Sequence, residues 1–110
     1  MRRGDIVTVI APGDFGKPRP AVVVQADALT KAGLGSVVLC LISSHWVEAP
    51  TFRIGVEPSK ANGLVQRSQI MADKLLTVPS ARVGEVIGSL DDETLFRLNR
   101  TLAFVIGLGQ

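Results

Sequence analysis

Apolar residues recur at helical spacing in only one long stretch of this chain, residues 90–108 at its C-terminal end. The spacing predicts one amphipathic helix whose core-facing stripe is Leu95, Leu98, Leu102, Val105 and Ile106. Asp91 is the expected N-cap, and Gly107 and Gly109 are expected to end the helix. The residues before this helix must therefore form most of the fold, and a sheet built from them has to protect its own edges.

Short, strongly apolar runs separated by glycine and proline make up that earlier part, a pattern typical of strands and turns. Residues 36–44 are expected at the centre of the sheet. Residues 27–35 leave room for at most one or two helical turns, and residues 80–82 for one turn. The other predicted strands cover residues 5–11, 21–26, 51–57, 64–67, 69–78 and 83–89, with 51–57 half-exposed beside the centre and 64–67 paired with 69–78. We predict a single domain over residues 1–110, mainly β with a C-terminal α-helix, folded as a small, partly open β-barrel.

The amino-acid composition indicates a globular protein and does not by itself indicate a function. An apolar fraction of 46% with 20% charged residues is typical of a globular domain, and a net charge of +2 is too weak by itself to indicate nucleic acid. Cys40 is the only cysteine, so we expect a small buried side chain and a reducing, cytoplasmic compartment. We expect no membrane span or leader segment. One histidine, one cysteine and no clustered carboxylates predict neither a metal site nor a cofactor.

A basic turn leads directly into one of the apolar strands. Lys17 and Arg19 alternate with Gly16, Pro18 and Pro20 immediately before the run that starts at Ala21. Proline and the buried strand fix the positions of these two cations, and we expect their charged ends to reach an anion. The turn is therefore either a functional centre or an ordinary basic surface turn closed by proline.

Three polar groups follow or precede predicted strands and are candidates to converge. They are Lys17 with Arg19, Ser43 with Ser44, and the triplet Gln66, Arg67 and Ser68. Together they would form a cationic pocket with hydroxyl donors, which suits a phosphodiester better than a peptide or glycoside. Such a site can cleave RNA without a metal, because the 2′-hydroxyl of the substrate is itself a nucleophile.

Two neighbouring residues have competing interpretations. A serine hydrolase is disfavoured because His45 directly follows the serines and lacks an evident orienting acid, so we interpret His45 as a residue at the rim. Trp46 either stacks on a base or covers an end of the barrel.

Phe96 and Phe104 lie off the core stripe of the helix, which indicates a second copy of the chain or local packing under a loop.

The cations of the pocket also predict a regulator. A groove with Lys17, Arg19, Arg53 and Arg67 attracts RNA phosphates and equally attracts a flexible peptide that presents carboxylates at similar intervals. We therefore expect a small partner whose acidic segment folds along the groove and excludes RNA.

Several motifs in their order resemble the MazF/PemK family of toxin ribonucleases of type II toxin–antitoxin systems. The resemblance covers nearly the whole chain: Arg3-Gly4-Asp5-Ile6-Val7, Arg19-Pro20-Ala21-Val22-Val23-Val24, Ile42-Ser43-Ser44, Gly63-Leu64 through Ser68, Ala72-Asp73-Lys74-Leu75-Leu76-Thr77-Val78, Arg82-Val83-Gly84 and Leu90-Asp91-Asp92-Glu93. The chain departs from the usual family pattern at Val7, Arg67 and Leu76.

The resemblance implies an SH3-like barrel, a homodimer, metal-independent and sequence-selective cleavage of single-stranded RNA, and inhibition by a cognate antitoxin. It assigns catalytic roles to Arg19, on the phosphate, and to Ser43. Lys17, Ser44, Gln66, Arg67 and Ser68 remain the predicted RNA-binding residues. A gyrase poison of the related CcdB type and a non-catalytic RNA-binding SH3-like barrel are the alternatives.

Overall fold

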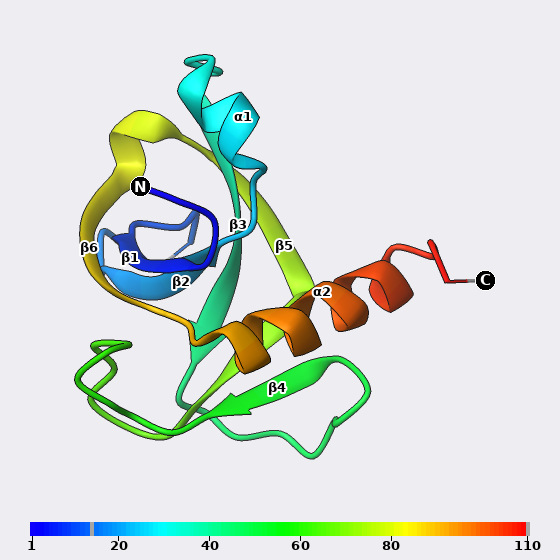
Figure 1. The fold of residues 1–110 in the computed structure, drawn as a ribbon. Helices are drawn as coiled ribbons and strands as arrows, with labels where there is room; N and C mark the ends of the chain where they lie inside the picture. Colours follow the sequence, from blue (N-terminus) through cyan, green and yellow to red (C-terminus); the bar gives the residue numbers. More distant parts are fainter. Residues whose placement is uncertain (14, 110) are drawn as a thin grey trace.

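The computed structural model describes residues 1–13 and 15–109, which form one curled antiparallel sheet with a helix across its lower part (Figure 1). The six strands are ordered β4-β5-β3-β2-β1-β6. Their bounds are β1 Asp5–Val9, β2 Arg19–Val23, β3 Ser36–Ser43, β4 Arg53–Val56, β5 Ser68–Pro79 and β6 Val83–Ser89. Three helical elements complete the fold: α1 Asp27–Lys31, the 3₁₀ turn η1 Ser80–Arg82 and α2 Asp92–Val105.

The central strands are buried on both faces, which explains why their sequences are apolar without alternation. On β2, Val22 packs into one core cluster with Ile6 and Leu98, while Ala21 and Val23 pack into a second cluster on the other face. Cys40 of β3 is buried in the first cluster, as predicted. Burial raises the pKa of its thiol to about 12, so the group behaves as a small hydrophobe.

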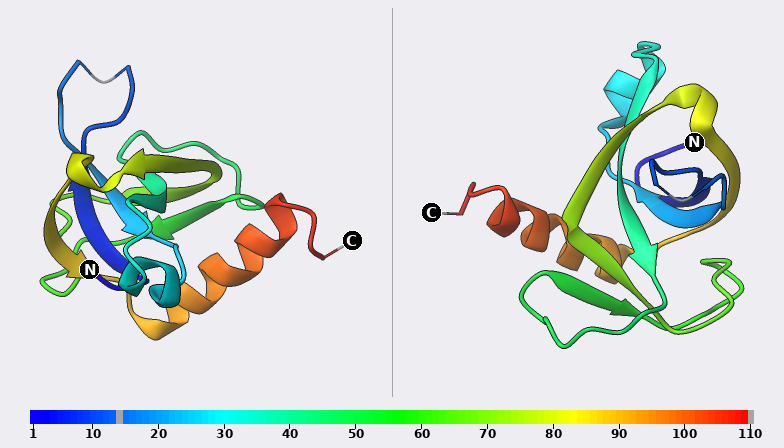
Figure 2. Two further views of the ribbon diagram at one scale, coloured as in Figure 1. Left: turned by 90° about the horizontal axis from the view of Figure 1, so that it is seen from above. Right: turned by 180° about the vertical axis from the view of Figure 1, so that it is seen from behind.

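A bulge in β5 allows the sheet to curl. The register of β3 on β5 shifts between the pairs Cys40↔Leu75 and Ile42↔Ile70, so β5 carries extra residues at this point. Its first residues pair with β4 on one side and with the end of β3 on the other, and its second half pairs with β3. Figure 2 shows the resulting curl from above and from behind, with β6 following β1 around one end. The predicted partly open β-barrel with a C-terminal helix is confirmed.

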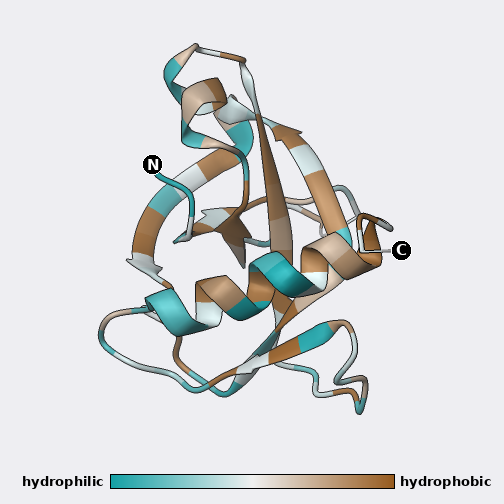
Figure 3. Ribbon diagram, turned by 45° about the vertical axis from the view of Figure 1, so that its right-hand side comes forward, coloured by the Kyte–Doolittle hydropathy of each residue, from teal (hydrophilic) through white to brown (hydrophobic). Residues whose placement is uncertain are grey.

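The helix α2 packs by one stripe only. Asp91 is the N-cap, as predicted, and its Oδ1 accepts a hydrogen bond of 2.7 Å from the backbone N–H of Thr94. Leu98 and Leu102 are buried in the first core cluster, whereas Phe96 and Phe104 are exposed. In Figure 3 apolar and polar segments alternate along this helix, in contrast to the mostly apolar β3. No helix in the described part of the chain is long and apolar enough to cross a bilayer.

Four expectations from the sequence differ from the structure. Residues 64–67 form a loop instead of a strand, because their backbone follows a turn tied to β6. The strand expected over 51–57 lies at the edge of the sheet, and the strand expected over 21–26 runs from Arg19 to Val23. The last helix ends at Val105, and Ile106, expected in the core stripe, is exposed.

Candidate active site

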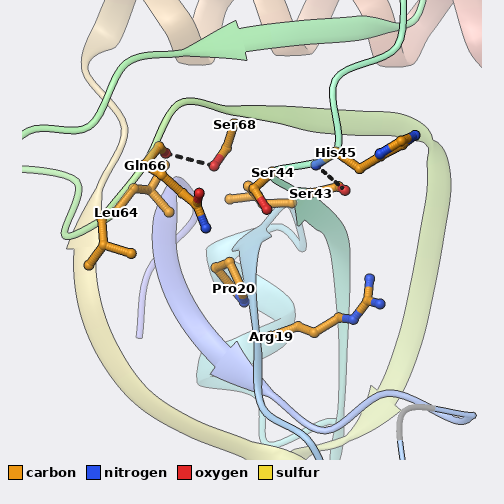
Figure 4. A pocket seen from close by; sticks show the side chains of 10 residues that line it. Arg19, Pro20, Ser43, Ser44, His45, Leu64, Gln66 and Ser68 are labelled. Carbon is orange, nitrogen blue, oxygen red and sulfur yellow. Dashed lines mark hydrogen bonds between the residues drawn. The ribbon is translucent and has the colours of Figure 1, made fainter.

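A cavity of about 350 Å³ opens where β2 begins and β3 ends (Figure 4). The two strands are antiparallel with Ala21 opposite Leu41, so the same register continued by two residues brings Arg19 opposite Ser43. Pairing of the two strands therefore joins the basic turn to the polar end of β3. The lining consists of Arg19, Pro20, Ile42, Ser43, Ser44, His45, Leu64, Val65, Gln66 and Ser68.

Five of the seven predicted site residues lie in this lining, and two do not. Arg19, Ser43, Ser44, Gln66 and Ser68 come together from three separate segments. In the view of Figure 4, the Arg19 guanidinium and the His45 ring end on one side of the cavity, and Leu64 and Gln66 form the other. The lining thus supplies the guanidinium of Arg19, the polar side chains of His45 and Gln66, and several serine hydroxyls. Groups of these kinds bind a phosphodiester.

The hydroxyl of Ser43 is oriented by the turn that follows it. Its Oγ accepts a hydrogen bond of 3.1 Å from the backbone N–H of His45. A hydroxyl that accepts in this way still has its own proton to donate. Ser43 is therefore arranged so that a ligand oxygen in the cavity can be an acceptor for it.

Ser68 plays a different part in the lining. It is buried, and its hydroxyl donates a hydrogen bond of 2.9 Å to the carbonyl oxygen of Gln66. Since that proton is already engaged inside the protein, the contact indicates that Ser68 shapes the loop that carries the exposed Gln66 side chain.

Asn62 stabilises the loop before β5, and the backbone of this loop is tied to β6. Its Oδ1 accepts from the backbone N–H groups of Ser59 and Leu64, each at 3.0 Å, and its Nδ2 donates to the carbonyl oxygen of Glu57 at 2.8 Å. Gly63, with φ of +72°, sits so close to β6 that a Cβ would lie 2.1 Å from the carbonyl oxygen of Ile87. This tight contact places Leu64 and Gln66 at the cavity.

The segment after β3 is fixed from the neighbouring strand β5. Gln69, which is 3% exposed, hydrogen-bonds both backbone polar groups of Val47. The sequence pattern did not identify Gln69 as part of the site. The one signal available was an amide inside an otherwise apolar run, and such a residue is usually hydrogen-bonded when buried.

Lys17 and Arg67 lie outside the described lining. Lys17 is exposed in the loop before β2. Arg67 projects toward Trp46, with its guanidinium carbon 3.6 Å from the ring centroid, and forms an ion pair of 3.3 Å with Glu57. Arg53, predicted to join the groove, is paired instead with Asp73 on β5 at 3.1 Å.

The donor set of the cavity differs from that of a divalent metal site. Among the described lining residues there is one imidazole, that of His45, and no carboxylate. Across residues 1–13 and 15–109, no three His, Cys, Asp or Glu side chains gather in a way that could hold a metal ion. Mg²⁺ and Ca²⁺ prefer carboxylate and carbonyl oxygens, so the side chains of this site fit an anion better.

Comparison with known proteins decides the family. Residues 2–106 match the family described as PemK-like, MazF-like toxins of type II toxin–antitoxin systems. The chain belongs to this family.

Individual relatives of the toxin agree with that assignment. A probable endoribonuclease MazF from Mycolicibacterium smegmatis is 37% identical over 109 residues, which is 98% of each chain. A solved endoribonuclease from Mycobacterial species, in complex with its cognate antitoxin, superposes with a TM-score of 0.82 at 21% identity over 98% of this chain and 96% of that one. MazF from a MazE–MazF complex of Deinococcus radiodurans gives 0.78 at 21% identity, covering 97% and 96%. These two structures support the fold.

Two of the departures from the family pattern lie away from the cavity of this MazF-like toxin. Val7 is fully buried in the second core cluster, and Leu76 packs against that cluster from β5. The third departure, Arg67, is at the exposed edge of the site beside Trp46.

Proposed function

We propose that this toxin is an endoribonuclease that cleaves single-stranded RNA in the cavity between β2 and β3 and does so without a metal ion. The observation that carries the proposal is the presence of Arg19 and Ser43 in one cavity whose described lining has no carboxylate. The related protein from M. smegmatis is described as a probable endoribonuclease, which supports the same activity here.

The reaction uses the nucleophile that RNA already contains. The 2′-oxygen attacks the adjacent phosphorus, the bond from phosphorus to the 5′-oxygen breaks, and the 2′-proton passes to a base while the 5′-oxygen gains a proton. The products are a 2′,3′-cyclic phosphate and a 5′-hydroxyl. Arg19 stabilises the charge that develops on the phosphorane, and the hydroxyl of Ser43 donates to one of its oxygens. Ser44 and Gln66 hold the RNA, with Lys17 and Arg67 binding the chain beyond the cavity.

A substrate lacking the 2′-hydroxyl tests the proposal. The toxin is incubated with an RNA, the same RNA methylated at every 2′-oxygen, and the DNA of the same sequence. Cleavage of the unmodified RNA alone supports the proposal. Equal cleavage of the DNA would contradict it, and no cleavage of any strand would favour a gyrase poison or a non-catalytic RNA-binding barrel.

We further propose that a cognate antitoxin inhibits the toxin by occupying the same groove. Arg19 and Lys17 would attract the carboxylates of an acidic, flexible segment as they attract phosphates, and association would slow as salt rises. The endoribonuclease of the Mycobacterial complex is bound to its cognate antitoxin, which supports such a partner.

A competition experiment tests this proposal. The partner is titrated against the toxin bound to labelled, fully 2′-methylated RNA. Displacement of the RNA supports competition, and a ternary complex with undiminished RNA affinity contradicts it.

We also propose that the toxin is a homodimer and that it acts in the cytoplasm, where its RNA substrate is found. The exposed phenylalanines of α2 support the first part, because an isolated monomer would leave both in water.

A further inference from the structure

An aromatic and a cationic side chain stack on one another beside the cavity. Trp46 lies in the segment after β3 and Arg67 in the loop before β5, with the guanidinium carbon 3.6 Å from the ring centroid. Their sequence neighbours His45, Gln66 and Ser68 all line the cavity. The stacked pair therefore borders the place where the phosphodiester is expected to bind.

The tryptophan is held firmly. Its Nε1 donates a hydrogen bond of 3.1 Å to Glu48. Its ring packs onto β4 at Gly55, where an added Cβ would lie only 2.8 Å from the ring atom Cη2. The next residue, Val47, is fixed by two hydrogen bonds from Gln69. These contacts fix the ring over which the guanidinium of Arg67 lies.

The arginine is held more loosely. Its Nε lies 3.3 Å from an oxygen of Glu57, and the two side chains are 60% and 77% exposed. Ion pairs this exposed are weak because water and salt screen them. Arg67 thus presents a planar, solvent-accessible cation on the ring of Trp46. Its side chain can change position at little cost in free energy.

The chemistry of that plane suits a nucleobase. Proteins that bind single-stranded RNA stack bases on aromatic rings and on arginine guanidinium planes. A guanidinium already supported by a ring loses less freedom when a base is added, and its charge also attracts the flanking phosphates. The covering role that Trp46 has on β4 accounts for the ring, but it does not require an oriented guanidinium on the ring's exposed side.

We propose that Trp46 and Arg67 form a stacking subsite for one base of the RNA, next to the nucleotides whose phosphodiester is cleaved. This inference rests on the proposed endoribonuclease function. The base lies on the outer face of the Arg67 guanidinium, and the ring of Trp46 supports the other face. Since stacking strength increases with the size of the π surface, the subsite favours a purine over a pyrimidine. It binds substrate and transition state alike, so it affects KM and leaves kcat unchanged.

The test separates the contribution of the planar guanidinium of Arg67 to RNA binding from the contribution of its charge. Arg67→Lys keeps the charge and removes the plane, Arg67→Ala removes both, and Lys31→Ala removes an exposed charge on α1 as a control. We expect the first two variants to bind a fully 2′-methylated RNA about tenfold more weakly, the loss expected for one stacked base. The control should bind as the wild type does. Arg67→Lys binding like the wild type would show that only the charge matters and would overturn the subsite.

An abasic scan locates the subsite along the RNA. Each base near the cleavage position is removed in turn, and affinity is measured for the wild type and for Arg67→Lys. At one position, removal of the base should lower the affinity of the wild type about tenfold. It should lower the affinity of Arg67→Lys only a little, because the protein partner of that base is already lost. Trp46 is the only tryptophan of the chain, so its fluorescence should change on binding intact RNA and change less when that base is missing.

The two proposals fail in different ways. If the wild type does not cut unmodified RNA, the proposed function is wrong. If it cuts RNA but no abasic position distinguishes it from Arg67→Lys, the function stands and the stacking subsite is wrong.

Discussion

The side-chain amide of Gln69 hydrogen-bonds both polar groups of the Val47 backbone. Its Oε1 accepts from the Val47 N–H at 3.0 Å, and its Nε2 donates to the Val47 carbonyl oxygen at 2.8 Å. Gln69 lies on β5 opposite Ser43 of β3, so this contact ties the segment with Ser44, His45 and Trp46 to the sheet. A loop that carries site residues is thereby held like part of a strand.

We predict that Gln69→Leu lowers both stability and activity. Leucine has a similar volume but leaves two backbone groups of Val47, a residue that is itself 37% exposed, without their partner, and each lost hydrogen bond contributes about 0.5–1.5 kcal/mol. Urea unfolding and the rate of RNA cleavage measure the two effects. Gln69→Glu is the matched control, because a carboxylate still accepts from the N–H and cannot donate to the carbonyl. Unchanged activity in the leucine variant would show that the clamp does not position the site.

Arg19→Ala should lower the cleavage rate about a hundredfold to a thousandfold while leaving the fold intact, as judged by circular dichroism. A methyl group cannot replace a planar cation that stabilises phosphorane charge, and the loss is typical of removing one such donor. Ser43→Ala should cost less, and Ser43→Thr should be tolerated because it keeps the hydroxyl. Lys31→Ala, which removes an exposed charge on α1 away from the cavity, serves as the charge-matched control. Normal cutting by Arg19→Ala would move the site elsewhere.

The exposed face of α2 predicts self-association. Phe96 and Phe104 are 60% and 61% exposed, whereas large aromatic groups are usually covered. The wild type should sediment as a dimer at micromolar concentration, and Phe96→Asp or Phe104→Asp should sediment as a monomer. Leu34→Asp changes an exposed leucine away from α2 in the same manner and should leave the dimer intact. A wild type that sediments only as a monomer contradicts the prediction.

The N-cap of α2 predicts a contribution to acid sensitivity. Hydrogen bonds from Thr94, its side chain first and its backbone N–H second, hold the pKa of Asp91 below the ordinary value of 3.8. A lowered pKa means that the ionised carboxylate favours the folded state. The contribution is therefore complete above pH 3.8 and is lost as the pH falls through the native pKa. Asp91→Asn still caps the helix but does not titrate, so its thermal midpoint should fall less than that of the wild type between pH 5 and pH 2. Equal losses would rule out this contribution.

Short apolar runs separated by glycine and proline were enough to place most of the sheet. Runs such as Ala21 to Val23 are buried on both faces, and this makes them recognisable as strands without any alternation. The N-cap at Asp91 was predictable because the signal is local. Residues 64–67 were mistaken for a strand because their path depends on hydrogen bonds to Asn62 and on the contact of Gly63 with β6, which no local pattern contains.

The site was predictable only as a set of candidates. Arg19 and Ser43 lie at strand ends, and antiparallel pairing brings them into one cavity. The directions of the long side chains were not predictable. Arg67 turns to Trp46 and Glu57, and Arg53 turns to Asp73, because each finds a partner on a strand or loop distant in sequence.

The most direct test of the central claim is the cleavage of a long single-stranded RNA in excess chelator, followed by identification of the new ends. Attack by the 2′-hydroxyl needs no metal-bound water, so we expect cleavage at the rate seen without chelator. The new ends should be a 5′-hydroxyl and a 2′,3′-cyclic or 3′-phosphate. Loss of cleavage in chelator with full recovery on adding Mg²⁺, or products with a 5′-phosphate and a 3′-hydroxyl, would contradict the proposed chemistry.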